Sequence, residues 1–201
     1  LGYACDVADG AVWETTLRQI QLDHPVLDVI VAVVGFARLI SASSLTEEDW
    51  QLHRALNLGY VRQAYRVLEN NLRRSGDPRF ATLGSRWSLR SDNDYLLPYI
   101  AAKHELRAWT RELASNNQWL KANHYCVPTM VTPQQIKLVE EAASAGYGEM
   151  LTKGSFHTST DYHEVANLLT SLILGSERSG QTYIMSKEGV VTLLPVTERG
   201  R

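Results

Sequence analysis

The sequence predicts a mainly α protein, with about six helices around one core and a C-terminal β-hairpin as a minor α+β component. Three observations favour this fold class. Apolar residues recur at helical spacing over most of the chain, helix-start signals precede several of these stretches, and strand-like segments flank a glycine turn near the C-terminus. The chain has 201 residues, of which 44% are hydrophobic and 21% charged, and this composition is typical of a globular protein.

The first two helices are expected over residues 11–22 and 25–40, with Pro25 in the first turn of the second. The second helix is apolar nearly all round, so we expect it to be buried at the centre of the fold. It carries Asp28 and Arg38 and has about 15 residues, whereas a membrane-spanning helix needs roughly 20 apolar ones. We therefore expect no membrane insertion.

The third helix is expected over residues 45–74. Ser44 and Glu47 fit a capping box at its start. Gly76 followed by Pro78 ends it. Its apolar residues fill one broad face, and the opposite face carries an arginine stripe, which consists of Arg62, Arg66 and Arg73.

The arginine stripe has two interpretations. The favoured one is a solvated face on which Arg66 pairs with Glu69. The other is a binding surface for a partner.

Residues 78–94 are rich in glycine, serine and arginine, and we expect a loop that holds at most a short strand. Arg86, Trp87 and Arg90 make this segment the best candidate for a recognition loop, because loops on a rigid scaffold supply many binding residues.

Three further helices are expected over residues 98–120, 133–146 and 161–174. Thr132 followed by Pro133 is a typical helix start. Asp161 with Glu164 caps the last helix. Residues 124–131 are expected to form a non-helical link.

A β-hairpin is expected over residues 182–186 and 190–194, because Lys187-Glu188-Gly189 suits a turn with a G1 bulge. A lone hairpin is marginally stable in water, so it needs a partner. Residues 126–131 or a neighbouring subunit are the expected sources of the partner strand.

Charge is segregated along the chain, although the formal net charge is only −2. Residues 1–53 contain eight acidic and two basic side chains, and residues 54–111 contain eleven basic and five acidic ones. We expect two parts packed on the same core. Residues 1–124 form a helical domain with an acidic N-terminal part and an arginine-rich middle, and residues 125–201 contain two helices and the hairpin.

Three interpretations of this segregation stay open. The acidic part neutralises the basic middle within one chain, or it binds the basic middle of a second copy or of a partner protein. Alternatively, RNA or DNA binds the arginines and the aromatic residues between them. The sequence pI of 6.3 counts against nucleic acid. The residues expected on a nucleic-acid or partner surface are Arg62, Arg66, Arg73, Arg74, Arg86, Trp87 and Arg90.

The densest group of reactive side chains includes His157, Asp161 and His163, which are the candidates for an acid–base site. Cys126 is a candidate nucleophile. The two histidines are six residues apart, so their spacing does not place two metal ligands on one helical face. Capping of a helix start by Asp161 explains part of the group equally well.

The sequence contains none of the motifs G-x-x-x-x-G-K-[ST], G-x-G-x-x-G, G-x-S-x-G or H-E-x-x-H, so we expect no cofactor and no metal. Cys5 and Cys126 are the two cysteines, and we expect reduced thiols in a cytoplasmic or otherwise intracellular protein. The start of the chain has no signal-peptide pattern.

These observations favour a structural or assembly component without enzymatic activity, such as a capsid, filament or machine subunit that binds another protein or copies of itself. The first alternative is an RNA- or DNA-binding protein that uses residues 54–111. The second alternative is a hydrolase or transferase centred on His157, Asp161 and His163.

Overall fold

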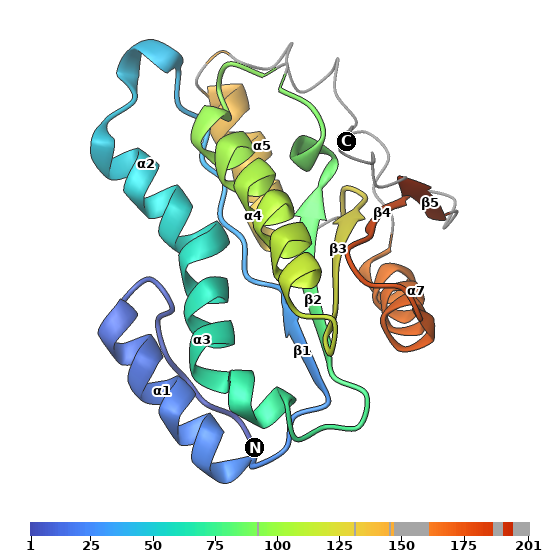
Figure 1. Ribbon diagram of the computed structural model, residues 1–201. Coiled ribbons are helices and arrows are strands. Elements are labelled where there is room, and N and C mark those ends of the chain that lie inside the picture. Colours follow the sequence, from blue (N-terminus) through green and yellow to red (C-terminus); the bar gives the residue numbers. More distant parts are fainter. Residues whose placement is uncertain (92, 131, 145, 147–160, 187–190, 195–201) are drawn as a thin grey trace.

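A five-stranded sheet forms the centre of the molecule in the computed structural model (Figure 1), which describes residues 1–91, 93–130, 132–144, 146, 161–186 and 191–194. In sheet order the strands are β1 (Val29–Ala32), β2 (Arg79–Ser85), β3 (Lys121–Val127), β4 (Thr182–Met185) and β5 (Val191–Leu194). The first four strands are parallel, and β5 runs antiparallel to β4. Because β1 to β4 are parallel, their carboxyl ends lie along one edge of the sheet. Parallel neighbours need long crossover connections.

Helices precede β1 and connect the parallel strands. In chain order they are α1 (Gly10–Asp23), η1 (Ala42–Ser44), α2 (Glu47–Arg54), η2 (Ala55–Gly59), α3 (Tyr60–Leu72), η3 (Arg86–Ser88), α4 (Leu97–Asn116), α5 (Pro133–Ser144) and α7 (Tyr162–Gly175). The segment η2 is a π-helix that joins α2 to α3, whereas η1 and η3 are short 3-10 helices. Among the residues described, no helix has the length and apolar character needed to cross a bilayer.

The expected mainly α architecture is wrong, because the core is a parallel sheet flanked by helices. The segment expected as a buried helix over residues 25–40 contains β1, and the expected loop over residues 78–94 begins with β2. The expected link over residues 124–131 contains most of β3. Strands covered on both faces read as continuous apolar runs, and such runs have the same appearance as a buried helix.

The other expected helices are confirmed, although one start differs. The long helix begins after Thr46 rather than after Ser44, and Thr46 forms a capping box with Asp49. Asp161 caps α7 as expected, since its side chain accepts hydrogen bonds from the backbone N–H groups of His163 and Glu164. Short polar side chains at these positions satisfy N–H groups that the helix leaves unpaired.

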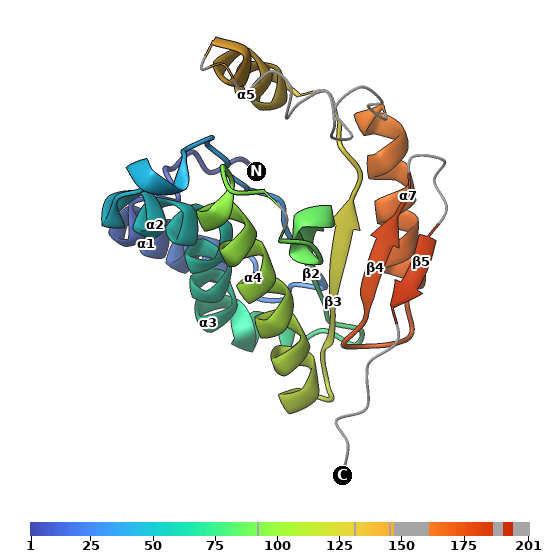
Figure 2. The same cartoon turned by 90° about the horizontal axis from the view of Figure 1, so that it is seen from above.

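The two faces of the sheet have separate apolar cores. Figure 2 shows α3 and α4 on one face and α7 on the other. Phe80 of β2 belongs to the core under α3 and α4, together with Val61 and Leu106. Leu83 of the same strand belongs to the core under α7. This alternation is expected of a strand, because successive side chains point to opposite faces.

The C-terminal hairpin is confirmed, and its partner strand lies in the same chain. β4 pairs with β5 on one side and with β3 on the other, where His124 is opposite Thr182. The hairpin therefore needs no neighbouring subunit to pair β4. The strand β3 runs across residue 124, and the sheet takes strands from both residues 1–124 and 125–201. The expected turn, Lys187-Glu188-Gly189, lies outside the described residues.

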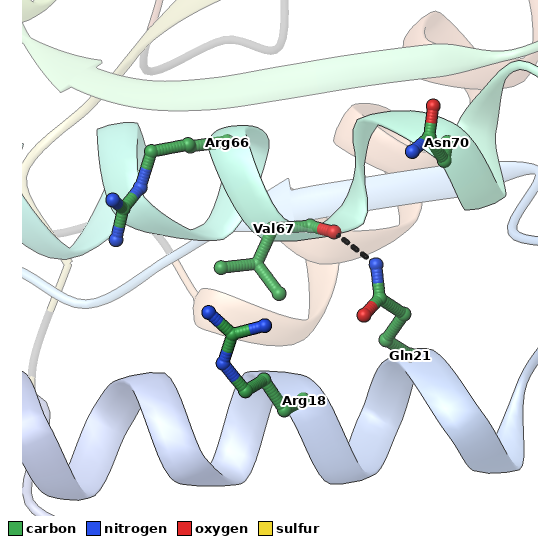
Figure 3. A pocket seen from close by; sticks show the side chains of 5 residues that line it. All are labelled: Arg18, Gln21, Arg66, Val67 and Asn70. Carbon is green, nitrogen blue, oxygen red and sulfur yellow. Dashed lines mark hydrogen bonds between the residues drawn. The ribbon is translucent and has the colours of Figure 1, made fainter.

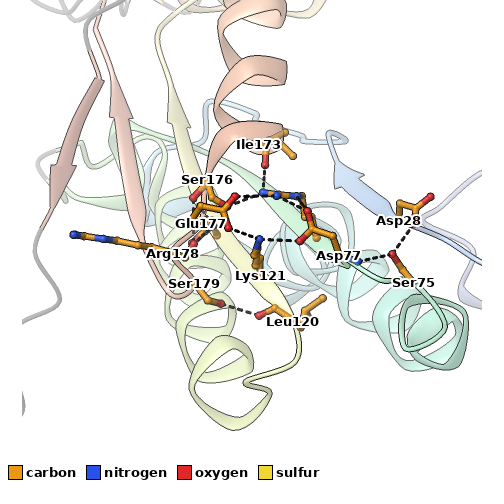
Figure 4. Close-up of polar contacts among 12 residues, drawn as sticks. Asp28, Ser75, Asp77, Leu120, Lys121, Ile173, Ser176, Glu177, Arg178 and Ser179 are labelled. Atoms are coloured by element: carbon orange, nitrogen blue, oxygen red, sulfur yellow. Dashed lines mark hydrogen bonds and ion pairs between the residues drawn. The ribbon is translucent and has the colours of Figure 1, made fainter.

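An ion-pair network holds the amino ends of the strands (Figure 4). Arg79 begins β2 and Lys121 begins β3, and both pair with Asp77 at 2.6 and 2.8 Å. Lys121 also pairs with Glu177 at 2.7 Å, in the segment that follows α7. The carboxyl ends of β1 to β4 lie at the opposite edge.

Candidate active site

A cavity of about 780 Å³ lies at the carboxyl edge of the sheet. Residues 33–37 after β1, residues 83–87 at the end of β2 and residues 127–130 after β3 line it. Gln135 and Leu138 of α5, which lies beyond the carboxyl end of β3 in Figure 2, complete the wall. Open sheets with parallel strands bind ligands in the crevice at this edge.

Lys103 of α4 places a buried amine in the cavity wall, where it is 4% exposed. Its Nζ donates a hydrogen bond to the carbonyl oxygen of Leu83 at 3.0 Å. No carboxylate among the described residues pairs with it. Burial lowers the pKa of Lys103 to about 8, because the charged form loses hydration. Lys103 is therefore a cation at neutral pH, with further N–H groups available to a ligand.

Tyr99 precedes Lys103 by one helical turn, so the two side chains share a face of α4. The Nζ atom of Lys103 lies 5.6 Å from the centre of the Tyr99 ring. The hydroxyl groups of Tyr99 and Ser85 form a hydrogen bond. Burial raises the pKa of Tyr99, and the hydrogen bond from Ser85 lowers it in part. A tyrosine and a lysine with shifted pKa values in one cavity form a candidate acid–base pair.

Asn57 lies in the π-helical segment η2 and is fully buried. Its Nδ2 donates to the carbonyl oxygens of Phe36 and His53, both at 2.8 Å, and its Oδ1 accepts from Phe36 N at 3.2 Å. A Cβ atom at Gly35 would lie 3.3 Å from Lys103 Nζ and 3.5 Å from Asn57 Oδ1. Asn57 thus fixes the segment after β1 against Lys103. Short π-helical turns occur frequently at functional sites.

A buried histidine supports the turn that follows β2. His124 Nε2 lies 3.2 Å from Ser88 Oγ, and its Nδ1 lies 2.8 Å from Thr82 Oγ1. Burial lowers the pKa of His124 to about 3, so the ring is neutral. Ser88 in turn accepts a hydrogen bond from Ser85 N at 3.2 Å. This chain of contacts holds Ser85 beside Tyr99.

Of the residues that the sequence suggested for catalysis, the three that the structure describes do not line this cavity. Cys126 is buried in β3, and burial raises the pKa of its thiol to about 11, so it is not a thiolate at neutral pH. Asp161 caps α7, and His163 is exposed beside it. No hydrogen bond between described residues joins Cys126 to either of them. His157 lies outside the described residues.

The arginines that were expected on one surface lie in two separate parts of the molecule. Arg66 pairs with Glu14 at 2.7 Å rather than with Glu69, which pairs with Arg73 at the same distance. Arg66 lines a hollow of about 180 Å³ between α1 and α3. Figure 3 shows Arg66 with the other side chains that line this hollow. Arg62 is exposed on α3, and Arg74 donates to the carbonyl oxygen of Pro25 at 3.3 Å.

Arg86, Trp87 and Arg90 line the cavity at the carboxyl edge instead. The loop singled out from the sequence therefore borders the candidate site, whereas the stripe on α3 does not. The Glu14–Arg66 pair joins the acidic N-terminal part to the basic middle, as expected if charge is neutralised within the chain.

Sequence reasoning missed Asn57, Ser85, Tyr99 and Lys103. A local signal existed for two of them, since a tyrosine and a lysine four residues apart in the first turns of a helix lie on one face. Ser85 and Asn57 reach the site only through the sheet and the π-helical turn, which the sequence did not reveal.

A helix-covered parallel sheet with a cavity at the carboxyl ends of its strands defines an α/β protein of the Rossmann type. Residues 1–187 match the sequence profile of a family described as enoyl-(acyl carrier protein) reductase. The chain belongs to this family, which is one of short-chain dehydrogenases/reductases.

Several known proteins resemble parts of the chain or its fold. A stretch of 57 residues, 28% of this chain and 22% of the relative, is 37% identical to D-threitol dehydrogenase of Mycolicibacterium smegmatis. The aldohexose dehydrogenase of Thermoplasma acidophilum superimposes with a TM-score of 0.78 at 19% identity, over 92% of this chain and 76% of that one. Sorbitol-6-phosphate 2-dehydrogenase of Erwinia amylovora gives 0.77 at 20% identity, over 94% and 78%.

The L-sorbose reductase of Gluconobacter frateurii, in a structure with NADPH and L-sorbose, also gives a TM-score of 0.77 at 19% identity, over 92% of this chain and 74% of that one. These structures share the fold. The chain spans about a fifth of the length of the curated relative that it matches.

Family membership overturns the functional expectations from the sequence. The interpretation as a structural or assembly component without enzymatic activity is wrong, because the matched family is one of oxidoreductases. The nucleic-acid and the hydrolase or transferase alternatives fall for the same reason. Those alternatives were argued from surface charge and from side chains near a helix start. The candidate site is instead formed at the carboxyl edge of the sheet.

Proposed function

We propose that this chain carries the catalytic site of an NAD(P)-dependent oxidoreductase that interconverts a hydroxyl group of a sugar or polyol and the corresponding carbonyl group. The observation that carries the proposal is the Tyr99–Lys103 pair on one face of α4, with Ser85 hydrogen-bonded to Tyr99, in the wall of one cavity. Acid–base chemistry at an oxygen atom needs such a group within hydrogen-bond reach.

The reaction removes one proton and one hydride from an alcohol, and its reverse adds both to a carbonyl. A nicotinamide cofactor supplies or accepts the hydride when it is bound. Tyr99 Oη gives the proton to the carbonyl oxygen in reduction and takes it from the hydroxyl in oxidation. Ser85 donates a hydrogen bond to the substrate oxygen and orients it. The charge of Lys103 stabilises negative charge on Tyr99.

The cavity suits the nicotinamide end of such a cofactor. Its described lining combines apolar side chains such as Val33 and Met130 with the Lys103 ammonium, which has N–H groups for ribose hydroxyls. Lys103 would hold those hydroxyls, and the apolar residues would contact the ring. The sequence contains no G-x-G-x-x-G motif, so we assign no residue to the cofactor's pyrophosphate.

The choice of sugars and polyols rests on the names of similar proteins. The D-threitol dehydrogenase acts on a polyol by its name, and the similar structures are named for aldohexose, sorbitol 6-phosphate and sorbose. An enoyl substrate, which the family description names, is the competing outcome of the test below.

The test is steady-state turnover of threitol, sorbitol and a crotonyl thioester by the full chain with NAD(H) or NADP(H), followed by the absorbance of the reduced nicotinamide. Polyol oxidation is expected, and Tyr99→Phe is expected to lower kcat by about 10²–10⁴-fold. The matched control is Tyr162→Phe, at an exposed position of α7, which should leave kcat unchanged.

Full activity of Tyr99→Phe would remove Tyr99 from the chemistry. Turnover of the thioester without turnover of any polyol would reject the substrate class while keeping the oxidoreductase.

A further inference from the structure

The cavity at the carboxyl edge has an uneven charge. Three cationic side chains line it, namely Arg86, Arg90 and Lys103, and none of the described lining residues is acidic. Lys103 belongs to the acid–base pair described above. The two arginines have no role in that chemistry, although they border the same space. A cluster of this sign favours a negatively charged ligand.

A rigid turn places these arginines. Arg86 and Trp87 belong to η3, whose first residues are capped when Ser85 Oγ accepts from Trp87 N at 3.0 Å. Ser88 closes the turn and lies 3.2 Å from the buried His124 ring. The backbone carbonyl of Arg90 lies 3.2 Å from His104 Nε2 of α4. Fixing both ends of the segment lowers the entropy that its side chains lose on binding a ligand.

The other wall supplies an independent observation. Gln135 of α5 lines the cavity, and its Nε2 atom is buried without a hydrogen-bond partner among the described residues. Buried polar atoms in proteins are nearly always paired, so an unpaired one in a cavity wall indicates a ligand acceptor. Gln135 N is itself fixed by Thr132 Oγ1 at 3.2 Å.

We propose that the substrate of this site carries an oxyanion, most directly a phosphate ester on a sugar or polyol, which Arg86 and Arg90 bind while Gln135 donates to an oxygen of the same molecule. This inference rests on the proposed function and adds the class of substrate. Arginine binds phosphate and carboxylate oxygens through two parallel N–H groups, which gives both affinity and orientation. Binding the anion at η3 would bring the reacting carbon near Ser85, the residue that precedes Arg86.

The experiment compares sorbitol, sorbitol 6-phosphate and gluconate as substrates of the full chain, which separates a neutral polyol from a phosphate and from a carboxylate. Sorbitol 6-phosphate is expected to have a kcat/KM at least about tenfold above that of sorbitol. The double variant Arg86→Gln/Arg90→Gln should lose that preference, because its KM for sorbitol 6-phosphate rises at least about tenfold. Arg62→Gln, at an exposed position of α3, is the matched control.

Gln135→Leu removes the proposed donor and should raise KM for the phosphorylated substrate about tenfold or more, with kcat preserved. Isothermal titration of sorbitol 6-phosphate and of inorganic phosphate gives a second readout that does not require turnover. Both ligands are expected to bind to the native chain, and neither is expected to bind to the double arginine variant.

The outcomes separate the two proposals. Turnover of sorbitol without any preference for an anion would overturn the substrate inference and leave the oxidoreductase in place. Arginine-dependent binding of sorbitol 6-phosphate without turnover would support the anion site and contradict the proposed function. If the arginine variants weaken NADP(H) binding and leave the substrate KM unchanged, the arginines bind the cofactor's phosphate and the inference is wrong. A preference for gluconate over sorbitol 6-phosphate would keep an oxyanion substrate and reject the phosphate ester.

Discussion

At the scale of single residues, Lys103 is a cavity-lining group whose pKa is shifted toward neutral pH. Burial lowers the pKa of its amine to about 8, whereas burial raises that of Tyr99. Burial also raises the pKa of Cys126 to about 11 and lowers that of His124 to about 3. A titration near pH 8 at this site therefore belongs to Lys103.

The first prediction concerns the pH dependence of carbonyl reduction. The pKa of Tyr99 is raised, so Tyr99 keeps its proton across this range, while Lys103 loses its charge as the pH rises through about 8. We expect kcat/KM to fall over that interval, because the neutral amine no longer stabilises negative charge on Tyr99. Lys103→Arg keeps a charge at all these pH values and should remove the fall near pH 8. A fall that persists in Lys103→Arg would assign the titration to another group.

The second prediction concerns the close approach at Gly84. A Cβ atom there would overlap His124 Nε2 and lie 2.7 Å from Ser88 Oγ, so Gly84→Ala must displace the buried His124 ring. We expect a loss of about 1–3 kcal/mol in the free energy of unfolding and lower activity, because His124 supports the turn that follows Ser85. Urea denaturation provides the measurement.

Gly76→Ala is the matched control, because a Cβ atom at Gly76 would meet nothing within 4 Å. Equal stability of the two variants would show that the sheet accommodates a methyl group beside His124.

At the scale of elements, the continuous helix formed by α2, η2 and α3 contacts the segment that follows β1. Three buried side chains make the contacts. Tyr60 Oη donates to Val34 O at 2.8 Å, Asn57 bonds both backbone groups of Phe36, and His53 Nε2 accepts from Arg38 N at 3.3 Å. One helix face thereby fixes an irregular segment that lines the cavity.

The third prediction tests this contact. Asn57→Ala leaves the backbone N–H and carbonyl groups of Phe36 without their partner, and an unpaired buried group costs about 1–3 kcal/mol. We expect a fall of about 2–4 kcal/mol in the free energy of unfolding, together with reduced turnover. Asn70→Ala, at an exposed position of α3, should change neither. Loss of stability without loss of turnover would limit Asn57 to a role in folding.

The sequence identified the helices better than the strands, for a physical reason. Helix starts carry local chemistry, such as the Asp161 cap of α7, and that chemistry is visible in single residues. The strand β1 has only four residues inside a long apolar segment, and nothing local distinguishes it from a buried helix. The hairpin was identifiable because two strand-like runs of sequence flank Lys187-Glu188-Gly189, which suits a tight turn.

At the scale of the whole molecule, Arg79 connects parts of the chain that are far apart in sequence. It is 5% exposed, and its Nη1 donates to the carbonyl oxygens of Ile173 and Ser176 at 2.7 and 2.6 Å. These carbonyl groups lie at the C-terminal end of α7, where a helix leaves its last carbonyl groups unpaired. Arg79 thus joins the start of β2 to the C-terminal end of α7.

The fourth prediction follows from that position. Arg79→Met should lower the free energy of unfolding by about 2–4 kcal/mol, mainly through the two lost carbonyl bonds, since hydrogen bonds from charged groups are the stronger ones. Its partner Asp77 is about half exposed, so that ion pair contributes little. The measurement is chemical denaturation in low and high salt. A loss that disappears in high salt would instead assign the effect to the ion pair.

The candidate site could be predicted from the sequence only in part. Arg86, Trp87 and Arg90 were found because arginine beside an aromatic residue in a loop is a local pattern, and they do border the cavity. Tyr99 and Lys103 were not among the predicted site residues. Their importance depends on the carboxyl edge of the sheet, which exists only when β1, β2 and β3 are parallel.

The central claim is that this cavity transfers a hydride from an alcohol carbon with Tyr99 as the acid–base group. Incubation of the full chain with a polyol that carries deuterium on its carbinol carbons and with NAD⁺ or NADP⁺ tests it directly, and mass spectrometry of the nicotinamide gives the result. We expect deuterium in the reduced cofactor with the native chain and with Tyr162→Phe, and a much lower yield with Tyr99→Phe. Equal deuterium transfer by Tyr99→Phe, or none by the native chain while it binds the cofactor, would contradict the account.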